Sequence, residues 1–172
     1  MDRRREQQAV RDWVVAEGYN TFCTLKFKNG YDIDERQAER VVQLFLQRVD
    51  KTYWGKRVER FNLRCPRFVF KQRGISRHNT HFHLVMQAQG DVHTFLQVLR
   101  STWARFNETC ASSSRFEQAQ NTEATGTYCT HEWAYLGSET FCDRLSHTAS
   151  TTGTDEGANI HKLRRLLKAI EG

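Results

Sequence analysis

The chain has 172 residues, of which 38% are hydrophobic and 27% are charged, a balance that describes one soluble globular domain with a substantial core. It contains no run of about 18 apolar residues, so no transmembrane helix is expected. No apolar signal-peptide core follows the charged N-terminus, and the five scattered cysteines suit a reducing compartment, so we expect a cytoplasmic location. A formal net charge of +6 favours a polyanionic partner.

The first half of the chain predicts two helices and a pair of strands. Apolar spacing predicts a helix over 6–17, and a strand over 19–28 follows it. A second helix begins at a capping box made by Asp32 and Glu35 and continues to about residue 50. Strand residues over 61–71 are interrupted by Cys65-Pro66, and a turn over 74–79 leads into a strand over 80–86.

The second half predicts a helix capped by Asp91, a last strand over 115–120 and a helical segment over 127–136. Residues 146–158 are rich in Ser, Thr and Gly and are predicted to be mobile, and 159–171 form a basic terminal helix. The order of elements predicts a single α+β domain with its core over about 20–145. Its central antiparallel sheet has helices packed on one side.

The most informative motif is His81-Phe82-His83, within a stretch that reads as a strand. Side chains alternate across a strand, so both imidazoles project from one face while Phe82 points to the other. This arrangement offers two nitrogen ligands to one divalent metal ion.

Basic residues recur along the chain, and some lie beside aromatic ones such as Tyr53 and Trp54. Cations interleaved with aromatics are suited to a single-stranded nucleic acid, whose bases stack and whose phosphates need neutralising. The cations expected to hold such a strand are Lys26, Lys71, Arg73 and Arg77.

A candidate nucleophile lies in the segment that begins at Tyr128. On a helix, Tyr128, His131 and Tyr135 share one face with Glu132, because residues three, four and seven apart align. A phenol is a poor nucleophile at its ordinary pKa of about 10, so it needs a base to take its proton. His131 is the expected base, or it steadies the charge that develops on phosphate.

A zinc site made of Cys129, His131, Cys142 and His147 is the other inorganic possibility. Structural zinc sites usually contain a Cys-x-x-Cys pair, and this chain has none, which disfavours zinc.

Taken together, the chain resembles the HUH endonuclease superfamily, and within it the rolling-circle replication initiators with one catalytic tyrosine. Residues 22–27 (Phe-Cys-Thr-Leu-Lys-Phe) resemble the first family motif, His81-Phe82-His83 the second, and the segment from Tyr128 to Glu132 the third, in the family's order. The resemblance implies a Rep-like fold with an RRM-like core.

The chain departs from the family pattern at two points. The lysine of the third motif is His131 here, so Tyr135 is kept as a second candidate nucleophile. The family often takes a third metal ligand, usually a glutamate, from the strand before the histidines, and 68–73 contains no acid. Gln72 is the expected substitute, through its carbonyl oxygen, and His78 is its competitor.

The resemblance implies an endonuclease that nicks and joins single-stranded DNA through a 5′-phosphotyrosine, with Mg²⁺ or Mn²⁺ on His81, His83 and Gln72. Its target would be single-stranded DNA or a hairpin at the origin of a phage, plasmid or satellite element. A helicase would act in trans, because the chain has no Walker A motif. Alternatives are transposition, plasmid mobilisation, an anti-phage nickase, or a non-catalytic module that binds single strands.

Overall fold

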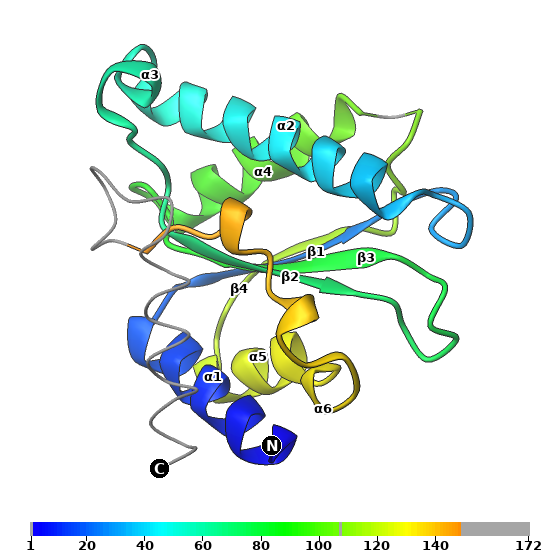
Figure 1. Cartoon of the computed structure of the whole chain (residues 1–172). Coiled ribbons are helices and arrows are strands. Elements are labelled where there is room, and N and C mark those ends of the chain that lie inside the picture. The colour runs from blue at the N-terminus through cyan, green and yellow to red at the C-terminus, as the bar shows by residue number, and fades with distance from the viewer. Residues whose placement is uncertain (1, 107, 149–172) are drawn as a thin grey trace.

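The computed structural model describes residues 2–106 and 108–148, in which a β-sheet lies between two layers of helices (Figure 1). The elements in chain order are α1 (Arg3–Glu17), β1 (Thr21–Lys26), α2 (Glu35–Trp54), α3 (Arg57–Phe61), β2 (Arg67–Gln72), β3 (His81–Met86), α4 (Val92–Ala104), β4 (Arg115–Gln118), α5 (Thr122–Thr130) and α6 (Trp133–Leu136), followed by two short 3-10 turns, Gly137–Thr140 and Asp143–Leu145.

The sheet has four strands in the order β2-β3-β1-β4, and every neighbouring pair is antiparallel. In this register His83 lies opposite Thr24 of β1 and Phe70 of β2. His81 lies opposite Lys26 and Gln72. The predicted α+β domain with a central antiparallel sheet is therefore confirmed.

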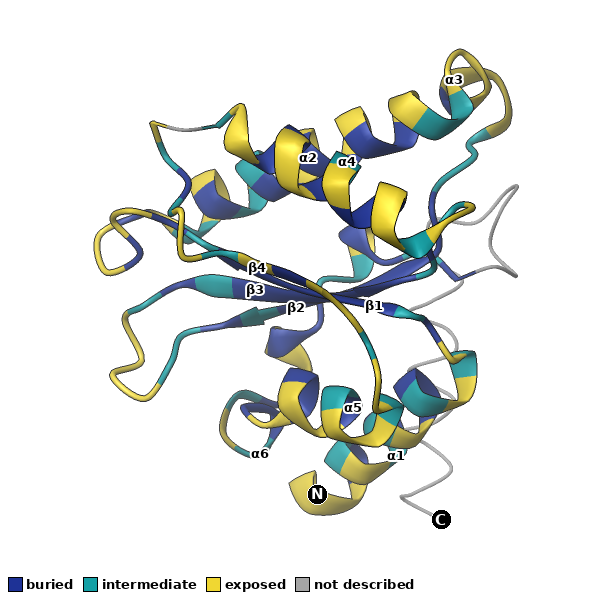
Figure 2. Cartoon of the chain, turned by 180° about the vertical axis from the view of Figure 1, so that it is seen from behind, coloured by how far each residue is buried: buried dark blue, intermediate teal, exposed yellow. Residues whose placement is uncertain are grey.

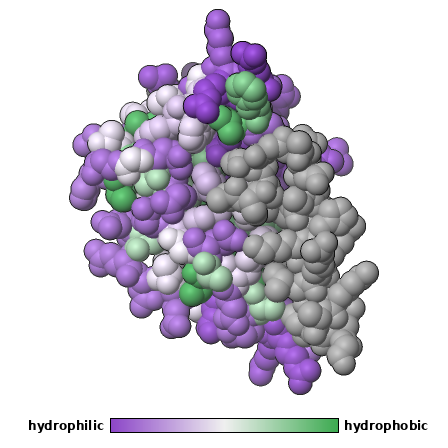
Figure 3. Space-filling view, turned by 90° about the vertical axis from the view of Figure 1, so that its left-hand side faces the viewer, coloured by the Kyte–Doolittle hydropathy of each residue, from purple (hydrophilic) through white to green (hydrophobic). Residues whose placement is uncertain are grey.

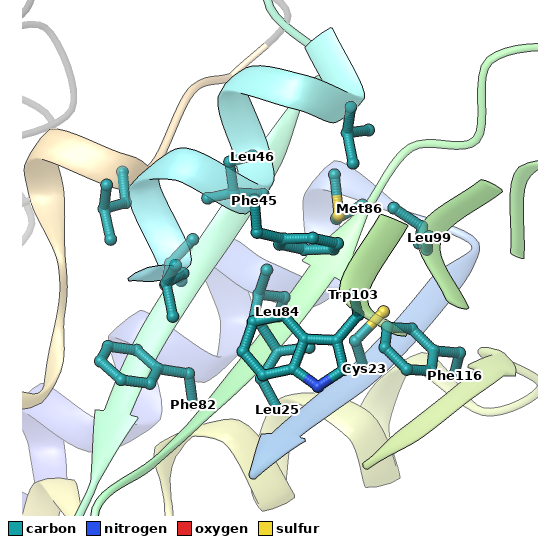
Figure 4. Close-up of a cluster of buried hydrophobic side chains, with 14 of the residues drawn as sticks. Cys23, Leu25, Phe45, Leu46, Phe82, Leu84, Met86, Leu99, Trp103 and Phe116 are labelled. Carbon is teal, nitrogen blue, oxygen red and sulfur yellow. The ribbon is translucent and has the colours of Figure 1, made fainter. Parts of the chain in front are cut away.

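One face of the sheet packs against α2 and α4 (Figures 1 and 2). Phe82, Leu84 and Met86 of β3 project to this face and are fully buried. They join apolar side chains of both helices, among them Phe45, Leu46, Leu99 and Trp103, in the larger hydrophobic cluster (Figure 4). Because side chains alternate along β3, every second residue of the strand is buried in this core.

The other face is covered by α1, α5 and α6, which lie on the opposite side of the sheet in Figure 1. Phe22, Phe68, Phe70 and Val85 form a second cluster there, with Trp13 of α1 among its members. The prediction that helices pack on one side only is therefore wrong. Strands that are apolar on both faces need cover on both, and five consecutive residues of β1 are buried.

The N-cap of α2 and the region before β2 differ from the sequence prediction. Helix α2 begins at Glu35, and its N-cap is Asp34, whose side chain accepts hydrogen bonds from the backbone N–H groups of Arg36 and Gln37; Asp32 lies outside the cap. The region 61–66 is not strand: Phe61 ends α3, which had no strong periodic signal because it is only five residues long.

The helical segment predicted over 127–136 is two helices, α5 and α6. They are separated at His131 and Glu132. The carboxylate of Glu132 accepts hydrogen bonds from the backbone N–H groups of Arg73 (2.8 Å) and Gly74 (2.8 Å). This side chain therefore ties the junction of the two helices to the end of β2.

A buried ion pair fixes the opposite end of β2. The carboxylate of Asp50 receives two hydrogen bonds from the guanidinium of Arg67 (2.7 and 3.0 Å) and one from the backbone N–H of Cys65 (2.9 Å). Arg67 also pairs through its backbone with His147. Ser146 and Thr148 are buried, so the described start of the segment predicted to be mobile packs on the fold. The rest of that segment, and the predicted terminal helix, lie outside the described residues.

No helix of the described chain is long and apolar enough to cross a membrane. On the face shown in Figure 3, hydrophilic side chains predominate among the described residues, and hydrophobic ones lie in small separate spots.

The imidazole of His147 should make stability depend on pH. Its pKa is lowered to about 4, first by burial and second by the cation of Arg67. The unfolded chain takes up this proton below its ordinary pKa of about 6.5, and the folded chain only near 4, so stability falls as the pH drops through that window. We expect the free energy of unfolding to lose on the order of 1–3 kcal/mol more in the wild type than in His147→Gln between pH 7 and 4. Urea titrations at both pH values measure this difference. An equal change in the free energy of unfolding for the two proteins between pH 7 and pH 4 would contradict it.

Candidate functional site

The two histidines of β3 project to the second face of the sheet, beneath α5. Their ring centroids are 4.9 Å apart, and the two ring planes are nearly perpendicular, at 86°. The strand and its alternation place both imidazoles side by side, as the sequence predicts for residues 81 and 83.

The hydrogen bonds of His81 define which ring nitrogen is free. Its Nδ1 lies 2.8 Å from the carbonyl oxygen of Asn79, which can only accept, so Nδ1 carries the proton. Nε2 of the neutral ring then carries the lone pair. Burial lowers the pKa of His81, which favours this neutral form.

His83 is fully buried, and its Nδ1 lies 3.1 Å from the hydroxyl of Thr24 on the neighbouring strand. Its Nε2 has no hydrogen-bond partner among the described residues. Burial, and then the nearby His81 and His131, lower the pKa of His83 well below its ordinary value. The ring is therefore neutral at physiological pH, and a Thr24 hydroxyl that accepts from Nδ1 leaves the lone pair on Nε2.

Gln72 lies directly beside His81 in the sheet and is fully buried. Its Nε2 donates to the carbonyl oxygens of Tyr128 (3.2 Å) and Cys129 (2.9 Å), in the last turn of α5. These two acceptors fix the orientation of the amide, because only the nitrogen end can donate. Its Oε1 is left buried, without a hydrogen-bond partner among the described residues.

Tyr128 lies on α5 with its phenol ring next to His83. The ring centroids of Tyr128 and His83 are 4.8 Å apart, and those of Tyr128 and Phe22 are 5.8 Å apart. Tyr128 is nevertheless 54% exposed. An exposed phenol in contact with a buried imidazole is accessible to a large substrate and stays close to the histidine pair.

The structure brings His131 to this site, whereas Tyr135 lies on the separate helix α6. The ring centroid of His131 lies 5.5 Å from that of Tyr128 and 6.4 Å from that of His83. Nδ1 of His131 donates to the carbonyl oxygen of Tyr128 (2.7 Å), so in the neutral form of the ring Nε2 carries the lone pair. Tyr135 makes no ring contact with either histidine of β3 among the described residues, because the break between α5 and α6 removes it from the shared helix face.

The four predicted cations do not lie together. Lys26 projects from β1 to the histidine face and lines a groove of about 320 Å³ beside Tyr128. Lys71 projects to the opposite face, where its ammonium group binds the carboxylates of Glu35 (3.0 Å) and Glu39 (2.7 Å). Lys71 therefore lies on the face of the sheet away from the histidines, with its ammonium group between two carboxylates. Arg73 and Arg77 line a second hollow, on the His131 side.

Three residues of this site were not assigned roles from the sequence. Phe22 stacks on His83 with ring centroids 5.5 Å apart, Thr24 contacts Nδ1 of the same ring, and Arg115 of β4 lines the groove with Lys26. Alternation places Phe22, Thr24 and Lys26 on one face of β1. The strand pairing needed to bring that face to His83 cannot be read from the sequence.

The donor set fits a divalent metal ion in part. No group of three or more His, Cys, Asp or Glu side chains suited to a metal occurs in the described part of the chain, so the alternative zinc site of Cys129, His131, Cys142 and His147 is not formed. Nε2 of His83 and Oε1 of Gln72 are, however, buried acceptor atoms without partners. Two imidazole nitrogens and an amide oxygen are donors that Mn²⁺ or Mg²⁺ accepts. His78 is exposed in the turn before β3, whereas Gln72 is buried beside His81.

Comparison of the chain with protein-family models, with curated proteins and with solved structures gave no match.

The amide of Gln72 should be required to hold α5 against β2. A glutamate at this position would direct carboxylate oxygens at two helix-terminal carbonyl oxygens, and both interactions would become repulsive. We expect Gln72→Glu to lower the free energy of unfolding at pH 7 by about 1–3 kcal/mol. Gln118→Glu adds the same charge at an exposed position of β4 and should change it by less than about 0.5 kcal/mol. Equal stability of both variants in urea would show that this amide does not hold α5.

Proposed function

We propose that this protein nicks and rejoins single-stranded DNA by transesterification, with Tyr128 as the nucleophile. The observation that carries the proposal is the exposed phenol of Tyr128 4.8 Å, centroid to centroid, from the buried ring of His83, which itself adjoins His81. The order of the sequence motifs, and their likeness to those of HUH endonucleases, supports the same reaction.

In the proposed reaction the phenol oxygen of Tyr128 attacks the phosphorus atom in line with the leaving 3′ oxygen. A bond from the tyrosine oxygen to phosphorus forms, the bond from phosphorus to the 3′ oxygen breaks, and a 5′-phosphotyrosine and a free 3′-hydroxyl result. The phenol proton passes to Nε2 of His131, the lone-pair nitrogen of that ring. The leaving 3′ oxygen takes a proton from water, and the imidazolium of His131 returns its proton to solvent, so the ring is neutral again. The reverse reaction rejoins the strand without a nucleotide cofactor.

The cofactor of the proposed reaction is Mg²⁺ or Mn²⁺, held by His81, His83 and Gln72. Such an ion polarises a phosphate oxygen and offsets the negative charge that grows on it. The chain itself keeps both imidazoles neutral by burial, so their nitrogens are ready to act as ligands at physiological pH.

The groove beside Tyr128 supports a single strand as substrate. Its lining combines the aromatic rings of Phe22 and Tyr128 with the cations Lys26 and Arg115. Rings that can stack on bases, next to cations that can neutralise phosphates, are typical of single-strand binding. The net charge of +6 adds a general attraction for DNA that weakens with salt.

In this proposal the free 3′ end primes replication of a mobile element in the cytoplasm of its host, and a helicase from the element or host separates the strands. The same chemistry could serve transposition, mobilisation or attack on another genome.

Replacing Tyr128 by Phe should abolish the covalent adduct. The variant loses only the hydroxyl, so the ring contact with His83 and the binding of DNA should persist, with stability changed by less than about 0.5 kcal/mol. Incubation with labelled single-stranded oligonucleotides and Mn²⁺, followed by a denaturing gel, should show label retained on the wild type and on Tyr135→Phe. Retained label should fall at least about 10³-fold in Tyr128→Phe. An adduct that survives in Tyr128→Phe and disappears in Tyr135→Phe would transfer the nucleophile to Tyr135.

Mn²⁺ should raise the stability of the wild type, and removal of the histidines should cancel that gain. A metal concentration 100 times the dissociation constant stabilises the folded state by about 2.7 kcal/mol. We expect this shift in thermal melts of the wild type and of His78→Ala. His81→Ala, and the double variant His81→Ala with His83→Ala, should lose both the shift and the adduct, with circular dichroism as the check of folding. Metal-dependent cleavage by the double variant at the wild-type rate would remove the metal from the reaction.

A further inference from the structure

A hollow of about 290 Å³ lies next to the candidate site, on the side away from the groove that holds Lys26. It lies between the turn that joins β2 to β3 and the junction of α5 with α6. His131 forms part of its wall. The ring centroid of His131 also lies 5.5 Å from that of Tyr128. His131 therefore borders both the hollow and the candidate nucleophile.

Two apolar side chains in this hollow are left open to solvent. Tyr135 of α6 is 66% exposed, and Ile75, in the turn between β2 and β3, is fully exposed. Neither belongs to the two hydrophobic clusters of the described fold. Large apolar groups that stabilise no core but gather around one hollow are typical of a binding site.

The polar part of the hollow is suited to an anionic ligand. Arg73 uses its Nε to bind Glu35 (2.6 Å), and its two terminal amino groups make no hydrogen bond among the described residues. The side chain of Arg77 likewise makes no hydrogen bond or ion pair within the described part of the chain. Both carboxylate oxygens of Glu132 already accept backbone N–H groups, so this acid is occupied by the fold.

We propose that this hollow binds the base of one nucleotide adjacent to the scissile phosphate, an inference that rests on the proposed nicking function. Tyr135 is then the surface on which the base stacks, Ile75 supplies apolar contact, and Arg73 and Arg77 neutralise the neighbouring phosphate. The volume lies at the small end of the range for ligand pockets, about 300–1,000 Å³, and suits one base rather than a longer segment. Tyr135 is in this view a binding residue and not a nucleophile.

An abasic scan of the oligonucleotide tests this proposal with the full chain. An oligonucleotide that the wild type nicks is made with one base at a time removed around the cleavage site, and its dissociation constant is measured by fluorescence anisotropy in EDTA. We expect one position beside the cleavage site to weaken wild-type binding on the order of tenfold. Tyr135→Ala should bind the intact oligonucleotide more weakly than the wild type, also on the order of tenfold. Removal of the base at that position should then not weaken its binding further.

Matched variants separate stacking from other roles. Tyr135→Phe keeps the ring and should therefore keep the response to the missing base that Tyr135→Ala loses. Ile75→Ser should weaken the response to the same missing base. Phe61→Ala, which removes an exposed aromatic ring of α3 away from the hollow, should change nothing.

The failures of the two proposals are distinguishable. If the wild type neither binds nor nicks single strands, the proposed function and this inference both fall. If it nicks, but Tyr135→Ala keeps the wild-type abasic profile, the base does not lie in this hollow and the proposed function stands. Loss of the adduct in Tyr135→Phe would overturn the assignment of Tyr135 as a stacking residue.

Discussion

Everything at the candidate site depends on the burial of β3 on both of its faces. Phe82, Leu84 and Met86 fill the core beneath α2 and α4, so His81 and His83 are forced to the face covered by α5. A shift of one residue in strand register would exchange the two sets and bury the imidazoles in the apolar core. The apolar alternation that stabilises the fold therefore also defines the position of the histidine pair.

Two side chains connect the helices of the second face to β2, and both act through backbone groups. Gln72 binds the carbonyl groups at the end of α5, and Glu132 binds the N–H groups that follow the strand. Helix α5 has only nine residues, too few to be stable alone, so tertiary contacts must hold it. These bonds place Tyr128 beside His83. They also explain why an amide suits position 72: a carboxylate there would meet carbonyl oxygens.

The same arrangement leaves polar atoms that the described fold does not satisfy. Nε2 of His83 and Oε1 of Gln72 are buried without hydrogen-bond partners. A buried unsatisfied polar group costs about 1–3 kcal/mol, so a structure that keeps two of them on one face of the sheet is less stable than it could be. Such strain is expected where a ligand completes the bonding, and this gives the metal proposal its physical basis.

The sequence predicted local features well and spatial relations less well. The common face of His81 and His83 follows from alternation alone, and Asp91 caps α4 as expected. The cover on both faces of the sheet could not be predicted, because an amphipathic stripe on α1 or α5 shows that a helix packs and not on which side. The break between α5 and α6 includes Glu132, whose carboxylate accepts hydrogen bonds from the backbone N–H groups of two residues 58 and 59 positions away in the chain. No local pattern encodes such a contact.

His131 offers this geometry a chemistry that a lysine at the same position could not supply. A lysine there would carry a positive charge at neutral pH and could only stabilise developing negative charge on phosphate. An imidazole whose Nδ1–H is held by the carbonyl oxygen of Tyr128 has a lone pair on Nε2, and it can accept a proton from a neighbouring phenol. In the proposed reaction, the ring that has accepted this proton is a cation next to the phosphate, as a lysine ammonium at this position would be. Under the proposed reaction, one side chain thus supplies first the base and then the charge, and the short turn between α5 and α6 keeps it beside Tyr128.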